Sequence, residues 1–109
     1  MTPDLSKTLD EVRAARDKML SGDQWSYLGI ELIVHLRGEQ DKLAELEQQV
    51  AAKKLEILGR QEKRNVAACE IELEATEVFA AKRKQELLIK IIEELNSHTK
   101  IQARSRNSY

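Results

Sequence analysis

The residues best suited to chemistry in this chain are Glu31, His35 and Glu39, which recur at every fourth position. On a helix they would share one face, where two carboxylates and an imidazole could bind a metal ion. No fourth ligand completes a tetrahedral set, because His98 is distant in the sequence and Cys69 belongs to an apolar stripe. We therefore interpret the three residues as a solvated helix face, and we predict no metal site and no cofactor.

The single cysteine, Cys69, cannot form a disulfide within the chain, which is typical of proteins in a reducing cytosol. Its place in an apolar stripe, four residues before Leu73, predicts a small buried side chain rather than a nucleophile. The sequence shows no Ser/His/Asp or Cys/His arrangement on adjacent faces and no phosphate-binding loop. We predict that the protein is not an enzyme.

A block of acidic residues lies past the middle of the chain, with no basic residue between Arg64 and Lys82. Glu70, Glu74 and Glu77 are spaced so that one continuous helix would place them on one face. Such a face is commonly just solvated. It could also dock a basic partner protein or imitate the charge of a nucleic acid. We take these three glutamates as candidate partner-binding residues.

Two aromatic residues, Trp25 and Tyr27, follow the break "SGD" at residues 21–23. Amphipathic aromatics at a helix end are enriched in protein interfaces. Both are therefore candidate partner contacts. For Trp25 the alternative, which we favour, is that it closes the end of a helix bundle beneath the first helix.

Two basic clusters are candidate nucleic-acid contacts, because lysine and arginine neutralise phosphates. No aromatic residue interleaves with either cluster, so stacking on bases is unsupported, and we favour solvated charged ends for both. The first cluster is Arg60, Lys63 and Arg64, and the second is Lys100, Arg104 and Arg106.

The composition predicts long helices. Charged residues make up 34% of the 109 residues and aromatics 4%, and 18 basic residues nearly balance 19 acidic ones. A strongly basic surface, typical of nucleic-acid binders, is absent. Burial must come from narrow apolar stripes, so we expect a homodimer or higher homo-oligomer. The apolar clusters are too short to span a membrane, and "MTPDLSKTLDEV" has no signal-peptide pattern, so we expect a cytoplasmic protein.

Apolar spacing predicts one helical domain over residues 1–109, with helices over about 3–20, 24–58 and 62–100 and a basic flexible tail at 101–109. Leu5, Leu9, Val12 and Met19 form the stripe of the first helix. In the break that follows, Gly22 suits a C-terminal cap and Asp23 an N-terminal cap.

The second and third helices carry stripes that match in antiparallel register when facing residue numbers sum to about 123. Gly59 lies next to the midpoint of this register, which predicts a turn at 61–62. The fold class is therefore all-α, with an N-terminal helix and a long antiparallel helical hairpin, as a coiled coil or three-helix bundle. The alternative is a long continuous helix that pairs between chains. The stripes are Trp25, Leu28, Leu32, Leu36, Leu43, Leu46, Val50 and Ile57, then Val66, Cys69, Leu73, Thr76, Ala80, Leu87, Ile91, Leu95 and His98. The facing charges are Asp23–Lys100, Arg37–Glu86, Glu39–Lys84, Asp41–Lys82 and Lys53–Glu70.

The segment "FAAKRKQELLIKIIEELNSHTKIQARSR", residues 79–106, resembles the C-terminal helix of small coiled-coil accessory proteins of tailed bacteriophages and prophages. In these proteins a Lys/Arg-rich helix ends in a short basic tail. The resemblance implies a small protein of the host cytoplasm that acts by binding. Our first hypothesis is a non-enzymatic protein–protein interaction module that inhibits or adapts a host complex. The alternatives are a nucleic-acid-associated replication or recombination accessory protein and a structural or assembly scaffold.

Overall fold

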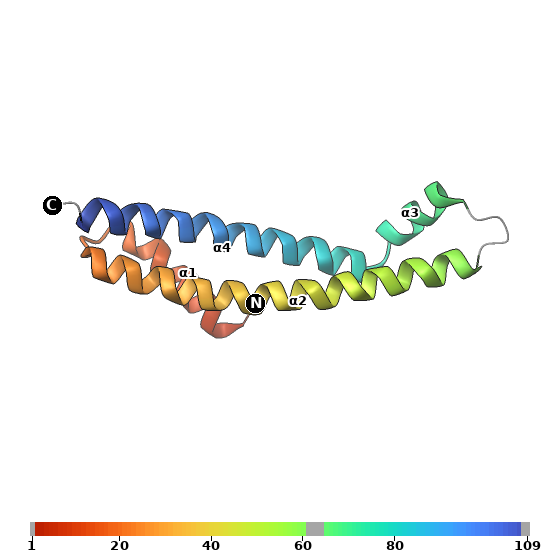
Figure 1. The fold of residues 1–109 in the computed structure, drawn as a ribbon, viewed down its shortest axis with the longest axis horizontal. Helices are drawn as coiled ribbons and strands as arrows, with labels where there is room; N and C mark the ends of the chain where they lie inside the picture. Colours follow the sequence, from red (N-terminus) through yellow and green to blue (C-terminus); the bar gives the residue numbers. More distant parts are fainter. Residues whose placement is uncertain (1, 61–64, 108–109) are drawn as a thin grey trace. The chain divides into compact units, whose positions relative to one another are not determined.

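The computed structural model describes residues 2–60 and 65–107, which form four α-helices and no strand (Figure 1). The helices are α1 (Pro3–Ala15), α2 (Gly22–Arg60), α3 (Val66–Glu74) and α4 (Glu77–Asn107). The all-α prediction is confirmed. Internal contacts divide the chain into unit 1 (Met1–Gly38 and Ile89–Tyr109) and unit 2 (Glu39–Leu88), so α2 and α4 each contribute to both units.

Unit 1 consists of α1, the first part of α2 and the last part of α4, and α2 and α4 run antiparallel (Figure 1). Each helix buries one apolar stripe, and each fully buried Leu or Ile side chain contributes about 1.5–3 kcal/mol. The Trp25 and His98 rings meet edge to face, with 5.5 Å between centroids. The buried apolar residues of the unit are Leu5, Leu9, Val12, Ala15, Trp25, Leu28, Leu32, Ile89, Ile92, Leu95 and Ala103.

Helix α1 begins at a capping threonine: the Thr2 hydroxyl oxygen accepts a hydrogen bond from the Leu5 N–H at 3.2 Å. The helix ends at Ala15 rather than near residue 20 as predicted. The Lys18 N–H donates to the Ala15 carbonyl at 3.1 Å, a three-residue bond that tightens the last turn. Met19 is therefore outside the helix and 90% exposed, so it adds nothing to the buried stripe.

Helix α2 begins with a capping box that the sequence prediction missed. The Ser21 N–H donates to Gln24 Oε1 at 2.8 Å, and the Gln24 N–H donates to Ser21 Oγ at 3.2 Å. Ser21 is thus the N-cap, and not Asp23 as predicted. Gly22 is the first helical residue and not a C-terminal cap, and no described glycine has a positive φ angle.

Unit 2 consists of the second part of α2, α3 and the start of α4. Ile57 of α2 packs with Cys69 and Leu73 of α3, and all three are buried. Asn65 caps α3, because its Oδ1 accepts from the Ala68 N–H at 3.3 Å. The chain therefore forms a helical hairpin and not one continuous helix. The predicted turn midpoint, 61–62, lies outside the described residues.

The third predicted helix, 62–100, is in fact two helices separated at Ala75 and Thr76. Thr76 caps α4: its hydroxyl oxygen accepts from the Phe79 N–H at 3.3 Å and donates its proton to the Leu73 carbonyl at 2.6 Å. The predicted stripe runs from α3 through this break to Leu87 and Ile91, but these two side chains are 62% and 41% exposed. A new helix starts at the Thr76 cap, so the positions of the buried residues in α4 do not continue the spacing of the buried residues in α3.

The predicted flexible tail at 101–109 is also wrong in its first part, because α4 is helical through Asn107. Ala103 is buried in unit 1, so packing continues beyond residue 100. Arg104 and Arg106 occupy the last turn, where the helix dipole favours positive charge. Ser108 and Tyr109 lie outside the described residues.

Candidate interaction site

The short helix α3, "VAACEIELE", carries apolar residues on more than one face. Cys69 and Leu73 are buried against α2, and the Cys69 thiol points at the Lys54 carbonyl with 3.9 Å between sulfur and oxygen. The prediction of a small buried cysteine is confirmed. Ile71 nevertheless remains 71% exposed and Val66 58% exposed. The helix therefore packs one apolar face on α2 and leaves a second apolar side chain, Ile71, exposed on the opposite face.

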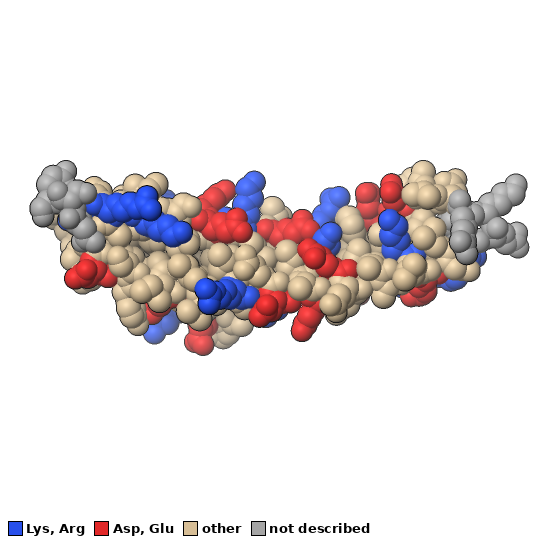
Figure 2. Space-filling view, viewed as in Figure 1, with Lys and Arg blue, Asp and Glu red and all other residues tan. Residues whose placement is uncertain are grey.

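Two of the predicted acidic residues lie to one side of the exposed isoleucine. Glu70, Ile71 and Glu74 are exposed neighbours on α3, and we call these three residues the α3 outer face. Figure 2 shows acidic side chains exposed in the region of α3 and the start of α4. Glu77 is exposed too, but it belongs to the first turn of α4. The prediction that all three glutamates share one helix face is therefore wrong.

The sequence prediction does not identify Ile71 as a candidate partner contact, because it considers only the apolar residues of the buried stripe. The signal was present in "VAACEIELE", since no phase of a helix gathers its apolar residues on one side. Glu72 in the same helix forms an ion pair with Arg60 at 3.3 Å. Both partners are about half exposed, so this pair adds little stability and mainly neutralises two charges.

A polar contact that the sequence did not predict lies inside unit 2. Glu39 is only 4% exposed, so its assignment to a solvated face was wrong. Gln85 Nε2 donates to Glu39 Oε2 at 2.5 Å and to the Glu39 backbone carbonyl at 2.9 Å, and Lys42 Nζ contacts Oε1 at 3.1 Å. Burial raises the pKa of the Glu39 carboxyl, but the hydrogen bonds from Gln85 and Lys42 outweigh it, and the pKa is lowered.

These contacts replace two of the predicted charge pairs, whereas the predicted register holds at Trp25 and His98, whose residue numbers sum to 123. Glu39 meets Gln85 instead of Lys84, and Lys53 pairs with Glu56 at 3.4 Å along its own helix. His35 Nε2 lies 3.3 Å from the Thr8 hydroxyl. Over residues 2–60 and 65–107, no three His, Cys, Asp or Glu side chains are grouped so that they could hold a metal ion.

The two aromatic candidates have opposite environments. Trp25 is 2% exposed beside His98, so it closes the core of unit 1 and the assignment as a partner contact is wrong. Tyr27 is 63% exposed. A hydrogen bond to the Glu31 carboxylate, together with the negative charge of that group, raises the pKa of the Tyr27 hydroxyl.

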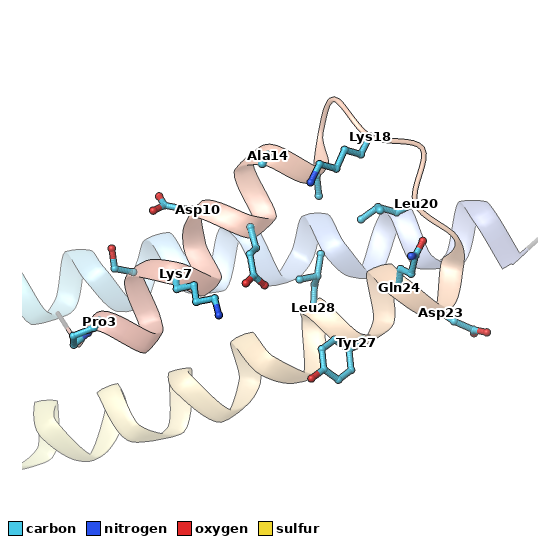
Figure 3. Close-up of a pocket in the computed structure, with 13 residues that line it drawn as sticks. Pro3, Lys7, Asp10, Ala14, Lys18, Leu20, Asp23, Gln24, Tyr27 and Leu28 are labelled. Atoms are coloured by element: carbon cyan, nitrogen blue, oxygen red, sulfur yellow. The ribbon is translucent and has the colours of Figure 1, made fainter.

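Tyr27 borders an open groove of about 1040 Å³ between α1 and α2 (Figure 3). Leu28 and Ala14 give the groove an apolar part, whereas Lys7 and Asp10 place both signs of charge along α1 (Figure 3). Because its lining carries both lysines and acidic residues, the groove presents no strong charge of one sign to a ligand.

The structure separates the predicted basic residues. Arg60 is engaged by Glu72, whereas Lys100 and Arg106 are exposed on α4 and Arg104 lies in its last turn. Figure 2 shows basic side chains over this C-terminal part of α4. Lys63 and Arg64 lie outside the described residues. Nucleic-acid binding stays a prediction.

Comparison with known proteins adds no assignment, since no family model matches the chain and neither a curated protein nor a solved structure is similar to it. Among the described helices, none has the length and apolar character that a membrane span requires.

Proposed function

We propose that the chain is a non-enzymatic helical interaction module that binds another protein through the α3 outer face. One observation supports this proposal: Ile71 is 71% exposed beside two exposed glutamates, on a helix whose opposite face is already packed. Burying a side chain of this kind contributes about 1.5–3 kcal/mol, so a partner that covers it gains affinity.

The charges of this face define the partner's chemistry. Glu70 and Glu74 would meet lysine or arginine side chains around an apolar depression that receives Ile71. Acidic residues at the rim chiefly accelerate association, whereas the central apolar contact slows dissociation. The resemblance of residues 79–106 to phage accessory proteins adds the biological setting: an inhibitor or adaptor that acts on a host protein complex.

The test is affinity capture from host lysate, followed by reconstitution with the purified captured protein. Ile71→Ser removes the apolar contact, and its matched control is Leu55→Ser, because Leu55 is 72% exposed on α2 of the same unit. We expect Leu55→Ser to bind like the wild type and Ile71→Ser to bind at least about tenfold more weakly. Equal binding by both variants would contradict the proposal.

Charge reversal tests whether Glu70 and Glu74 contribute to partner binding through their negative charges. Glu70→Lys with Glu74→Lys should slow association and weaken its salt dependence, compared with Glu45→Lys with Glu47→Lys on the exposed surface of α2. Sedimentation of the free chain separates self-association from partner binding. If the wild type is a dimer that Ile71→Ser converts to a monomer, the α3 outer face joins two copies and the proposal of a different partner fails.

A further inference from the structure

The first part of α2 carries a second apolar stripe on its solvent side. Tyr27, Ile30 and Val34 are 63%, 60% and 65% exposed, and we call these three residues the α2 seam. Their spacing of three and four residues places them on one helix face. Ile30 and Val34 each follow a buried leucine, Leu28 and Leu32, by two positions, which is a rotation of about 200° around the helix. The α2 seam therefore faces away from the core of unit 1.

Neither the core nor helix formation explains why the α2 seam is apolar. Isoleucine and valine are poorer helix formers than the lysine and glutamate that suit solvent-facing helix positions. One exposed apolar residue is ordinary, but three on the same face form a patch of the kind that marks protein–protein contacts. A partner helix that packs along the α2 seam would bury all three.

The charges at the two ends of the α2 seam indicate which partner fits. Asp23 lies seven residues before Ile30 and Arg37 lies seven residues after it, so both are two helical turns from the centre and on the same face. Both are exposed. Over residues 2–60 and 65–107, no ion pair includes either of them. The face thus ends in an unpaired negative charge on one side and an unpaired positive charge on the other.

This arrangement is complementary to itself. In a two-fold dimer, if residue i of one copy contacts residue j of the other, then j also contacts i. An antiparallel pair of seams with the two-fold axis at Ile30 places Asp23 of each copy opposite Arg37 of the other, and Tyr27 beside Val34. A parallel pair would instead place like charges opposite each other. We propose that the α2 seam binds the α2 seam of a second copy of this chain, antiparallel, about an axis at Ile30.

The inference does not rest on the proposed function, because the α2 seam belongs to unit 1 and the α3 outer face to unit 2. Residues 23–37 span about 21 Å at 1.5 Å per residue. A contact of this length is small for a protein interface, so we expect a reversible dimer whose population rises with protein concentration.

Sedimentation of the full-length chain over a concentration series tests the apolar part of the contact. Ile30→Ser should weaken dimerisation at least about tenfold, because Ile30 meets its own copy at the centre. Ile101→Ser is the matched control, since Ile101 is 63% exposed on α4 of the same unit, and it should dimerise like the wild type. A wild type that stays monomeric up to about 1 mM, or equal effects of the two variants, would overturn the inference.

Charge exchange tests the antiparallel orientation. Asp23→Arg and Arg37→Asp should each weaken self-association at least about fivefold, because each turns two opposite-charge contacts into two like-charge contacts. An equimolar mixture of the two variants should associate about as tightly as the wild type, since every arginine then faces an aspartate. Glu93→Arg, at an exposed position of α4, is the control and should have little effect.

Two results would count against this orientation or this surface. A mixture of the charge variants that associates no more tightly than either variant alone would contradict antiparallel pairing. A dimer that Ile71→Ser dissociates and Ile30→Ser does not would place self-association on the α3 outer face and overturn the inference.

Discussion

Glu39 and Gln85 show at the scale of single residues how a polar contact can choose between helix registers. Apolar stripes fit one another in several registers, but a buried carboxylate fits only where a donor meets it. Gln85 supplies that donor to both the side chain and the backbone of Glu39. Shifting α4 by one residue against α2 within unit 2 would leave both groups buried and unpaired.

Removing one partner of the Glu39–Gln85 contact should lower the stability of the fold. We expect Glu39→Ala to lower the free energy of unfolding by about 1–3 kcal/mol, because the Gln85 amide loses its buried acceptor. Urea denaturation followed by circular dichroism measures the change. Glu45→Ala, at an exposed position of α2, is the control. The double variant Glu39→Leu with Gln85→Leu should be less destabilised than Glu39→Ala, and a larger loss in the double variant would contradict this account.

The lowered pKa of Glu39 predicts a dependence of stability on pH. The folded-state pKa lies below the ordinary value of 4.5, so the stabilisation is fully present above that value and is lost as the pH falls through the folded-state pKa. Thermal melting between pH 3 and pH 7 should therefore show a smaller acid loss in Glu39→Gln than in the wild type. Parallel curves for the two proteins would exclude Glu39 as a source of acid sensitivity.

At the scale of helices, the caps decide where each helix begins. Ser21 and Gln24 start α2, Asn65 starts α3 and Thr76 starts α4. The threonine cap is readable in "EATEVF", because threonine before a glutamate-led apolar stretch is a recognised helix start. The sequence prediction overlooked it because glutamate, alanine and leucine on both sides favour a continuous helix.

Thr76 therefore offers a direct test of the boundary between α3 and α4. Thr76→Ala should lower the free energy of unfolding by about 1 kcal/mol, and Thr76→Ser, which keeps the hydroxyl, should restore most of that loss. Chemical denaturation measures both. If serine and alanine destabilise equally, the hydroxyl does not cap α4.

Two glycines of α2 should respond oppositely to the same substitution. A Cβ at Gly29 would lie 2.9 Å from Thr99 Oγ1, whereas a Cβ at Gly38 would meet nothing within 4 Å. Gly38→Ala should raise the free energy of unfolding by about 0.5–1 kcal/mol through helix propensity. Gly29→Ala should lower it, and adding Thr99→Ser should not relieve the clash, because the hydroxyl remains. Stabilisation of both glycine variants, compared by thermal melting, would show that the Thr99 hydroxyl moves freely.

At the scale of the whole molecule, burial is unevenly distributed. Among the described residues, unit 1 contains seven of the nine side chains that are almost completely buried, and unit 2 contains only Ile57 and Cys69. Both units expose large apolar side chains by more than half, among them Leu55, Val66, Ile71 and Leu87 in unit 2 and Met19, Ile30, Val34 and Ile101 in unit 1. Because unit 2 has the smaller buried core, its stability should depend more on association than that of unit 1.

Hydrogen exchange measures this difference. Backbone amides in residues 22–32 of α2 should be more protected than those in residues 66–74 of α3, because local opening is easier where few apolar side chains are buried. Adding a partner that covers the α3 outer face should raise protection mainly in α3. Uniform protection of both segments in the free chain would contradict this uneven distribution.

The sequence alone predicts the features that depend on each residue's own helix propensity and on the spacing of apolar residues. Helix formation, the extent of α2 to within two residues at each end, and the buried Cys69 follow from propensity and spacing. The buried face of α4 and the environment of Glu39 depend instead on which neighbour each residue meets. "LLIKII" offers apolar residues on several faces, so its own spacing cannot select Ile89 and Ile92 over Leu87 and Ile91.

The cap at Thr76 has a consequence for how the chain can tolerate insertions and deletions. In an uninterrupted helix, one added residue rotates everything after it by about 100° and turns the buried face outward. The cap restarts the helix at Thr76, so a residue gained or lost in the outer part of α3 leaves the rotation of α4 unchanged. A one-residue insertion in α3 should therefore leave the packing of unit 1 intact.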